Sequence, residues 1–344
     1  MNHPSTSVRR RILTGVKPSG SLHLGNYFGA IKPSIEESKN PDSEVILMCV
    51  DMHALTNRSQ MREAGAHSLP LIAAYLALGF QPEGNSIIVQ SDFPQIVTIS
   101  WFLSCATHIG LLERAHAFKD AVANGKDPTC GLFYYPVLMA SDILTFGAQD
   151  IPVGKDQAQH LEYAADMAGY FNSAVGQEVF LKPKAIIQDL PLMVGIDGSR
   201  KMSKSYNNEI PLFGDSKFIE KRIKSITTDA KGLDDPKDPE TCPIFQILQT
   251  FASAERIADM HQKLTKGTGY GYGHAKRDLF EAHQETFGAH AEKYNHYLNH
   301  PKEVADLLEP GRQRATNIAD GVLQKAKDAL GLLALQSSKA NKMQ

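Results

Sequence analysis

Two short polar stretches of the chain contain residue types that bind phosphate groups. One of them, GSRKMSKSYNN (198–208), places Arg200, Lys201 and Lys204 among serine hydroxyls. No apolar face runs through it, so we expect an exposed, mobile loop rather than a buried helix or strand. Because the whole chain has a formal net charge of −2, this concentration of cations is local and indicates an anionic ligand. Taken alone, the same stretch could also be a solvated basic loop.

The other stretch, LTGVKPSGSLHLGNYFGAI (13–31), joins an apolar strand to a helix through a turn that contains glycine. The free N–H groups and the dipole at the start of a helix bind anions. His23 and Asn26 are three residues apart, so both side chains lie on one face of the first helical turn. Gly25 would let a purine or a ribose approach the backbone closely. HLGN alone also fits an ordinary strand-to-helix turn with a capping asparagine.

Short β-rich runs separated by helical patterns fill the first half of the chain. Strands that are apolar throughout and alternate with helices predict a parallel sheet covered on both faces. We therefore expect a doubly wound, Rossmann-like α/β fold, whose ligands bind beyond the carboxyl ends of the strands. The expected strands are 10–16, 44–51, 85–92 and 148–154, and two of the expected helices are 61–80 and 156–171.

The pattern changes after about Asn208, where the strands stop and helices follow. In SKFIEKRIKSI (216–226) apolar side chains recur at helical spacing, and the lysines fall on the other side. The predicted organisation is an α/β domain at 1–208 that includes the KMSKS loop, an all-helical domain at 209–333, and a polar tail at 334–344. Further helices are expected within 242–252, 253–264, 275–298 and 301–333, after a polar connector at 231–241.

Composition and local sequence exclude several classes of protein. With 36 Lys and Arg against 38 Asp and Glu, the chain is not one that coats nucleic acid non-specifically, so any RNA contact would use local patches. The N-terminus lacks the apolar segment of a secretory signal, and apolar runs such as VILMCV (45–50) are too short to span a bilayer. The spacing of Cys49, Cys105, Cys130 and Cys242 is not that of a metal site. We expect reduced, mostly buried thiols, a cytoplasmic location without membrane contact, and no bound metal.

HLGN and KMSKS together resemble the HIGH and KMSKS signatures of class I aminoacyl-tRNA synthetases. Further stretches resemble tryptophanyl-tRNA synthetases in particular, in that family's order and across nearly the whole first half. They are TGVKPSGSLHLGNYFGA, CVDMHALT (49–56), GLLERAHAFKD (110–120), YPVLMASDIL (135–144), VGKDQAQHLE (153–162) and KMSKSYNN. The helical half resembles the family more loosely, through ITTDAKG (226–232) and DPETCPIF (238–245), and tyrosyl-tRNA synthetases are a weaker match.

The resemblance implies an ATP site built from both signatures. Lys201 and Lys204 would form a mobile clamp on the triphosphate that stabilises charge shifting toward pyrophosphate. The residues implied in catalysis are His23, Asn26, Lys201, Ser203 and Lys204. Those implied in ATP binding are Lys17, Pro18, Ser19, Gly25, Asn26, Lys119, Gly154, Lys155, Asp156, Leu192, Met193, Lys201, Met202, Ser203 and Lys204. In this set Gly154, Lys155 and Asp156 would hold the ribose, whereas Leu192 and Met193 would border the adenine.

The resemblance also implies a pocket for the amino acid. Its residues would be Tyr135, Met139, Asp142, Ile143, Val153 and Gln157, with His53 nearby. Asp142 has a physical argument of its own, because it lies inside an apolar helical pattern where an unpaired carboxylate is costly. An indole has one polar group, an N–H donor, so a buried acceptor suits it. On this segment alone, Asp142 could instead cap a helix or pair within the protein.

Three positions depart from the family's usual pattern. Lys17 stands where many members have Gln, Lys155 replaces the usual acidic residue of the ribose motif, and Leu13 replaces a common aromatic residue. The two extra cations could change ATP affinity or the need for Mg²⁺ but leave the reaction class intact. Some members carry an iron–sulfur cluster in the helical domain; Cys242 stands alone there, so we expect none.

The function implied is activation of L-tryptophan by ATP, which brings Mg²⁺ with it, followed by transfer of the aminoacyl group to tRNA(Trp). A homodimer is implied as well, with the helical domain contacting the anticodon. One alternative is a tyrosyl-type synthetase. Another is an adenylate-forming nucleotidyltransferase that uses no tRNA, against which the large helical segment argues. A third is a non-catalytic RNA-binding paralogue, against which the intact His23, Asn26, Lys201 and Lys204 argue.

Overall fold

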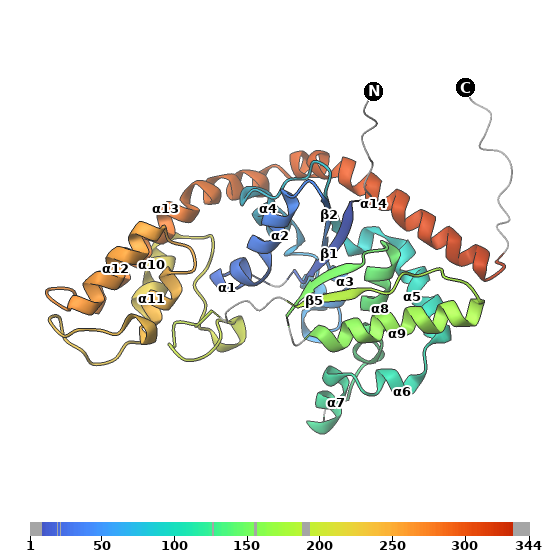
Figure 1. Cartoon of the computed structure of the whole chain (residues 1–344), viewed down its shortest axis with the longest axis horizontal. Coiled ribbons are helices and arrows are strands. Elements are labelled where there is room, and N and C mark those ends of the chain that lie inside the picture. Colours follow the sequence, from blue (N-terminus) through green and yellow to red (C-terminus); the bar gives the residue numbers. More distant parts are fainter. Residues whose placement is uncertain are drawn as a thin grey trace.

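A parallel sheet in the order β3-β2-β1-β4-β5 forms the centre of the α/β half, and its five strands lie within the described residues (Figure 1). The structure is a computed structural model that describes residues 9–18, 20, 22–125, 127–154, 157–187 and 193–332. The strands are β1 (Arg10–Val16), β2 (Ser43–Cys49), β3 (Ser86–Val89), β4 (Asp150–Val153) and β5 (Lys184–Ile187).

Helices cover both faces of this sheet because alternate side chains of the strands are apolar in both directions. On β2, Val45 and Leu47 belong to one hydrophobic cluster, whereas Ile46 and Met48 belong to the other. The first cluster is shared with α2 (Lys32–Ser38) and α4 (Ser68–Ala77). The second is shared with α5 (Pro94–Ala106), α8 (Cys130–Thr145) and α9 (Ala158–Val175). The predicted doubly wound α/β fold is confirmed.

Shorter helices complete this half of the chain. They are α1 (Leu24–Asn26), which continues into a π-helical turn at Tyr27–Ile31, α3 (Asp51–Ala54), α6 (Ile109–Leu112) and α7 (His116–Ala123). In place of the predicted helix at 61–80, a 3₁₀ turn at Arg58–Glu63 precedes α4. Pro70 explains the break, because proline is tolerated in a first helical turn but cannot continue a helix that started upstream. β5 was not predicted, since it is a short, largely exposed strand at the edge of the sheet.

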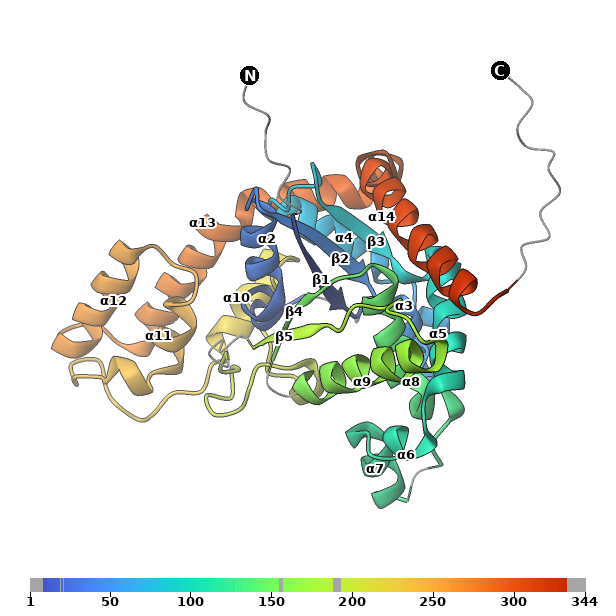
Figure 2. The ribbon, with the colours of Figure 1, turned by 45° about the vertical axis from the view of Figure 1, so that its right-hand side comes forward.

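The second half is helical, as predicted. α10 (Ser216–Lys224), α11 (Pro243–Leu248) and α12 (Ala254–Lys266) form a group beside the α/β half (Figures 1 and 2). The 28-residue helix α13 (Tyr272–Asn299) runs from this group to the sheet domain, where the His290 imidazole bonds to the carbonyl of Ala77, 2.8 Å away. No helix in the described part of the chain is long and apolar enough to cross a membrane.

The last helix, α14 (Pro301–Ala329), packs on the α/β half although it lies within the range predicted for the helical domain. Ala315, Ala319 and Ala326 belong to the same hydrophobic cluster as α5, α8 and α9. The Ser86 hydroxyl donates to the carbonyl of Gly311 at 2.9 Å, which ties α14 to the start of β3. α13 therefore joins the two halves of the molecule, while α14 lies along the α/β half, as Figure 2 shows.

The cysteines correct one expectation. Cys49 and Cys242 are buried, but Cys105 and Cys130 are exposed, so the prediction of mostly buried thiols is wrong for these two. Cys105 lies on the outer side of α5 and Cys130 is the first residue of α8. All four thiols are free.

Candidate active site

A cleft of about 560 Å³ opens between β1 and β4, where the order of strands reverses. The chain runs outward from β1 through β2 to β3, then returns to the other side of β1 as β4. Gly15 and Lys17, from the end of β1, and Gly154, just after β4, line the cleft. Such a reversal at the carboxyl ends of parallel strands is the usual ligand site of a doubly wound sheet.

All the residues predicted for the amino-acid pocket line this cleft. Most are contributed by α8, and the others come from α3, β4 and the segment that follows β4. They are His53, Tyr135, Met139, Asp142, Ile143, Val153 and Gln157. Their proximity is now established, whereas their roles toward a ligand stay predictions.

Asp142 places a buried carboxylate on the cleft wall, with only 4% of the residue exposed. Its Oδ2 lies 2.8 Å from Nε2 of His53, and its Oδ1 accepts a bond of 2.7 Å from the Gln90 side-chain amide. Burial raises the pKa of Asp142, although the bonds from His53 and Gln90 oppose that shift. Each carboxylate oxygen has a second lone pair, so the group can still accept a hydrogen bond from a ligand.

Gln90 is a member of this site that sequence reasoning missed. It is fully buried just after β3, and its Oε1 accepts from the backbone N–H of Met52 at 3.1 Å. The amide therefore links the ends of β2 and β3 to the carboxylate on α8. The only signal in the sequence was a polar residue directly after the apolar run SIIV, and that signal does not tell which way the side chain points.

A second group of hydrogen-bonded side chains includes Tyr135 and Gln157 of the cleft wall. The Tyr135 hydroxyl lies 2.7 Å from Nε2 of His160, whose Nδ1 is 2.9 Å from Oε1 of Gln157. Burial raises the pKa of Tyr135, so its hydroxyl stays protonated at neutral pH. His160 was not predicted, although it follows Gln157 by three residues and so shares its face of the helix.

In the HLGN turn, a side chain holds the backbone and the imidazole of His23 is buried. The N–H of His23 donates to Oδ1 of Asn26 at 3.1 Å, so this asparagine holds the start of α1. The His23 residue is 6% exposed, and its Nδ1 has no hydrogen-bond partner among the described residues. Burial, helped by the charges of Lys204 and Lys201, lowers the pKa of His23 to about 4. The imidazole is therefore neutral at pH 7 and has an unused polar atom.

The KMSKS segment lies directly against the HLGN turn. A Cβ on Gly20 would stand 3.2 Å from Nζ of Lys204, so the ammonium group rests on the backbone of the glycine turn. Burial lowers the pKa of Lys204, and the charge of Glu209 opposes this. Just beyond the loop, the N–H of Leu24 donates to the carbonyl of Ile210 at 3.0 Å. Two motifs that are far apart in the sequence thus form one structural unit.

Asn208 anchors the KMSKS segment from inside and was also missed by sequence reasoning. It is 1% exposed, and its Oδ1 accepts from the N–H of Ser203 at 2.7 Å. Its Nδ2 donates to Asp197 at 2.7 Å and to the carbonyl of Lys201 at 3.1 Å. A Cβ on Gly195 would stand 2.1 Å from the same Nδ2, so only glycine fits there. The asparagine therefore links both ends of the segment that holds the two lysines.

The expectation of a wholly exposed KMSKS loop is wrong at Met202. This residue is buried in the core cluster, and its N–H donates to the carbonyl of Met193 at 2.7 Å. Val194 and Lys201 form an antiparallel bridge, so neighbouring side chains point alternately outward and inward. Lys201 is exposed as a result, while Met202 faces the core and fixes the segment.

The other predicted residues are placed as follows. Lys17 is exposed at the cleft, yet the surrounding protein lowers the pKa of its ammonium group by desolvation. Pro18 and Met193 are buried. Lys119 lies exposed on α7 and does not line the cleft. The predictions for Ser19, Lys155, Asp156 and Leu192, and for the tail at 334–344, fall outside the described residues.

Comparison with known proteins identifies the family. The family of class I tRNA synthetases for tryptophan and tyrosine (W and Y) matches residues 6–288. The chain belongs to this family. It is 42% identical to the tryptophan–tRNA ligase of Campylobacter jejuni over 323 residues, which are 94% of this chain and 100% of that protein. It is 40% identical to the tryptophan–tRNA ligase of Pseudomonas aeruginosa over 337 residues, 95% of this chain and 75% of that protein.

Solved structures of the family agree with the fold. The crystal structure of tryptophanyl-tRNA synthetase from Campylobacter jejuni complexed with ADP and tryptophan has a TM-score of 0.87 and 41% identity. The alignment covers 94% of this chain and 100% of that one. Tyrosyl-tRNA synthetase from Archaeoglobus fulgidus has a TM-score of 0.62 at 18% identity, which shows a shared fold alone.

Proposed function

We propose that this chain is a tryptophan–tRNA ligase that makes tryptophanyl-adenylate from L-tryptophan and ATP and then charges tRNA(Trp). One observation carries the proposal: a buried carboxylate, Asp142, lines a largely apolar cleft that Lys17 also lines at the end of β1. The two tryptophan–tRNA ligases at about 40% identity support the choice of amino acid.

Selection of tryptophan is assigned to Asp142. His53 and Gln90 hold the two carboxylate oxygens in place, so the group needs no rearrangement when a ligand enters. Its free lone pair would accept the indole N–H, while Met139, Ile143 and Val153 provide apolar surface for the ring. Tyrosine would place its hydroxyl elsewhere and phenylalanine offers no donor, so both would exclude water from the remaining lone pairs of the carboxylate without replacing its hydrogen bond.

ATP binding is assigned to the unit formed by the HLGN turn and the KMSKS segment. The orphaned Nδ1 of His23 and the ammonium group of Lys204 supply, respectively, a neutral polar atom and a charge beside the glycine turn. Both fit a triphosphate, which accepts hydrogen bonds and carries negative charge. Lys17 adds a further cation at the edge of the cleft. Mg²⁺ enters with ATP as part of the substrate.

The reaction follows from positioning and charge. The carboxylate of tryptophan is already ionised and attacks the α-phosphorus in line, which forms a P–O bond and releases pyrophosphate. Lys201 and Lys204 stabilise the negative charge that moves onto pyrophosphate. A ribose hydroxyl of the last tRNA nucleotide then attacks the acyl carbon, and AMP leaves. Neither step requires a covalent bond to the protein.

The partners and location form the remainder of the proposal. We assign tRNA(Trp) contact at the anticodon to the helices of 209–333, and we place the reaction in the cytoplasm, which suits four free thiols. A homodimer is supported by α5, where Trp101 is 66% exposed next to exposed Val97. Trp101 is the single tryptophan of the chain. Sedimentation of wild type and of Trp101→Glu tests this, since a monomeric wild type contradicts the dimer.

Exchange of labelled pyrophosphate into ATP tests the function. We expect exchange that depends on tryptophan and is not supported by tyrosine, and charging of tRNA(Trp) in a second assay. Exchange with tyrosine in place of tryptophan would identify a tyrosyl-type enzyme. Exchange without any charging of tRNA would indicate a nucleotidyltransferase, and the absence of exchange would indicate a non-catalytic paralogue.

A further inference from the structure

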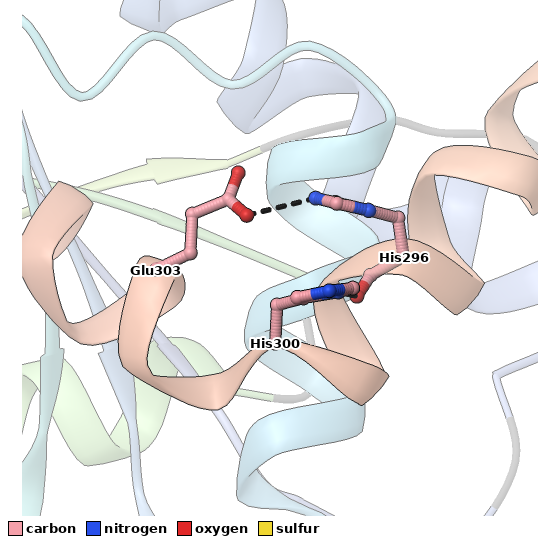
Figure 3. Close-up of side chains that lie close together, drawn as sticks. All are labelled: His296, His300 and Glu303. Atoms are coloured by element: carbon pink, nitrogen blue, oxygen red, sulfur yellow. Dashed lines mark hydrogen bonds and ion pairs between the residues drawn. The ribbon is translucent and has the colours of Figure 1, made fainter.

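A set of metal-binding side chains lies outside the cleft, at the junction of the two longest helices. His296 is in the last turn of α13, His300 connects the helices, and Glu303 is in the first turn of α14 (Figure 3). Each residue offers one ligand atom, and these atoms all lie within 4.8 Å of one another. All three residues are exposed, so an ion in solution can reach them.

The local structure already orients two of the three donors. Nε2 of His296 lies 2.8 Å from Oε2 of Glu303. Nδ1 of His300 lies 2.8 Å from the carbonyl oxygen of His296, and a carbonyl only accepts, so this nitrogen carries the proton. The lone pair of His300 is therefore on Nε2, the other ring nitrogen. A hydrogen bond of this kind to the second nitrogen is what orients most metal-bound histidines.

The two imidazoles are also held side by side. Their ring centroids are 4.1 Å apart and the planes differ by 23°, so the two rings are stacked, as Figure 3 shows. Pro301 and Glu303 are the first and third residues of α14, where proline and an acidic side chain favour the start of a helix. The carboxylate is therefore kept next to the histidines by the same residues that begin α14.

The chemistry of the donors selects the ion. Two imidazole nitrogens and one carboxylate oxygen suit Zn²⁺ and similar transition metals, whereas Ca²⁺ and Mg²⁺ prefer oxygen alone. Zinc bonds of about 2.1 Å in a tetrahedral arrangement place the donors roughly 3.4 Å apart. The His296–Glu303 pair would open by about half an ångström and His300 would move closer. His300 would also turn its ring out of the stack with His296, because a metal ion lies in the plane of each imidazole that binds it.

We propose that His296, His300 and Glu303 bind one Zn²⁺ ion, which releases to solvent the proton now shared by His296 and Glu303, with water as the remaining ligand, and that the ion fastens the junction between α13 and α14. Both helices are tied to the α/β half near this point, α13 through His290 and Ala77 and α14 through Gly311 and Ser86. An ion between them would fix the angle at which α13 leaves the sheet domain. For these histidines, the proposal replaces the sequence-based expectation of no bound metal.

Calorimetric titration of Zn²⁺ into the full-length, tag-free chain, stripped beforehand with a chelator, tests the site. We expect one saturable site in wild type, a Tm that rises with zinc concentration, and binding weakened by roughly 10-fold or more in His300→Ala and Glu303→Gln. His261→Ala is the matched control, since His261 is exposed on α12 and should leave the titration unchanged.

Cobalt gives an independent readout, because Co²⁺ held by three protein ligands absorbs visible light more strongly than the hexahydrated ion. The absorption should be present in wild type and His261→Ala and lost in His300→Ala. Circular dichroism of each variant confirms that the exposed substitutions leave the helices intact. The proposal is overturned if wild type shows no saturable site, or if all four proteins bind zinc equally well.

Discussion

The pKa and the orientation of the Asp142 carboxyl group depend on two neighbouring side chains as well as on its burial. His53 and Gln90 each donate to one oxygen, so a negative charge can persist where burial alone would disfavour it. Such an acceptor costs free energy when a ligand excludes water without offering a donor. Under the proposed assignment, discrimination among amino acids would reside in one residue whose carboxylate His53 and Gln90 already hold in place.

Replacing Asp142 by alanine should remove the preference for tryptophan. We expect kcat/KM for pyrophosphate exchange to fall steeply with tryptophan and little with phenylalanine, since discrimination of roughly 10⁴ can depend on such a bond. The measurement is kcat/KM with tryptophan, tyrosine and phenylalanine in both proteins. Ser141→Ala, a buried neighbour on α8 whose hydroxyl bonds to the Leu138 carbonyl, is the control. A variant that keeps its full preference for tryptophan contradicts the assignment.

Removing either lysine of the clamp should slow adenylate formation while tryptophan affinity changes little. Loss of one preorganised donor to a transition state typically costs about 10²–10³ in kcat. The larger effect is expected for Lys204→Ala, because that ammonium group rests on the glycine turn while Lys201 is exposed. Rapid-quench measurement of the tryptophanyl-adenylate burst in wild type and in each lysine variant tests this prediction. Arg200→Ala is the control: the guanidinium of Arg200 lies over the Tyr206 ring, and its removal should leave the wild-type burst unchanged. Wild-type bursts in both lysine variants would contradict the assignment of Lys201 and Lys204 to the triphosphate.

For single residues, the sequence predicts which side chains belong to the site better than it predicts which way each side chain points. His53 and Asp142 could be placed in one pocket because they belong to stretches that resemble a family. Gln90 and Asn208 could not, since a single polar residue after a strand or a loop does not reveal whether it turns inward. Met202 was misjudged for a related reason: a lone apolar residue among cations has no periodic pattern, yet backbone bridging turned it toward the core.

At the scale of elements, the segment from Gly195 to Asn208 is held together by hydrogen bonds to one group, the side-chain amide of Asn208. Asp197 accepts from the N–H groups of Ser199 and Arg200 at 3.1 and 2.9 Å, and these backbone bonds lower the pKa of its carboxyl. Asn208 then joins that turn to Ser203. We therefore infer that the position of both lysines depends on a fully buried side chain, and that Asn208 is a positioning residue.

Asn208→Ala should loosen the clamp without removing it. We expect kcat to fall by about 10–100-fold with a weaker effect on KM for tryptophan, since remote misplacement of a catalytic group costs on that scale. Asn207→Gly is the matched control: Asn207 is exposed with a φ of 49°, a conformation in which glycine is unstrained. Steady-state exchange kinetics with varied ATP and tryptophan separate the two effects. Equal kcat in wild type and Asn208→Ala would show that the anchor does not position the lysines.

The elements themselves were predicted unevenly. Strands buried on both faces, such as β2, can be predicted because they are apolar runs in the sequence. The helices of the second half can be predicted because their apolar residues recur at helical spacing. β5 has neither signal, because an edge strand is half exposed and need not be apolar. The packing of α14 on the sheet could not be foreseen either, since its small residues Ala315 and Ala319 are compatible with many partners.

For the molecule as a whole, buried histidines link folding stability to pH. Burial lowers the pKa of His283 on α13 to about 4, as it does for His23. Between pH 6.5, near the ordinary pKa of histidine, and pH 4, each of these histidines is protonated in the unfolded chain but neutral in the folded chain. The free energy of unfolding should therefore be unaffected above pH 6.5 and decrease as the pH falls through this window.

We expect His283→Gln to flatten this dependence. The amide of glutamine can replace the bond that Nε2 of His283 makes to the Pro211 carbonyl at 3.1 Å, but it does not titrate. The loss attributable to His283 is about 3 kcal/mol across the window. Urea unfolding at pH 7.0, 6.0 and 5.0 measures the slope for both proteins. Identical slopes would contradict a buried, neutral histidine at this position.

α13 also has a mechanical consequence. Its 28 residues make a rod roughly 42 Å long, and a change of angle where it meets α14, near His300, would move its other end the most. A swing of about 5° there would carry the far end, beside α10–α12, through roughly 4 Å and Phe287 through roughly 2 Å. Phe287 packs edge-on against Tyr27, directly after the HLGN turn, with ring centroids 5.2 Å apart. The rod thus acts as a lever with a ratio near two, converting a large excursion at the helical end into a small one beside His23.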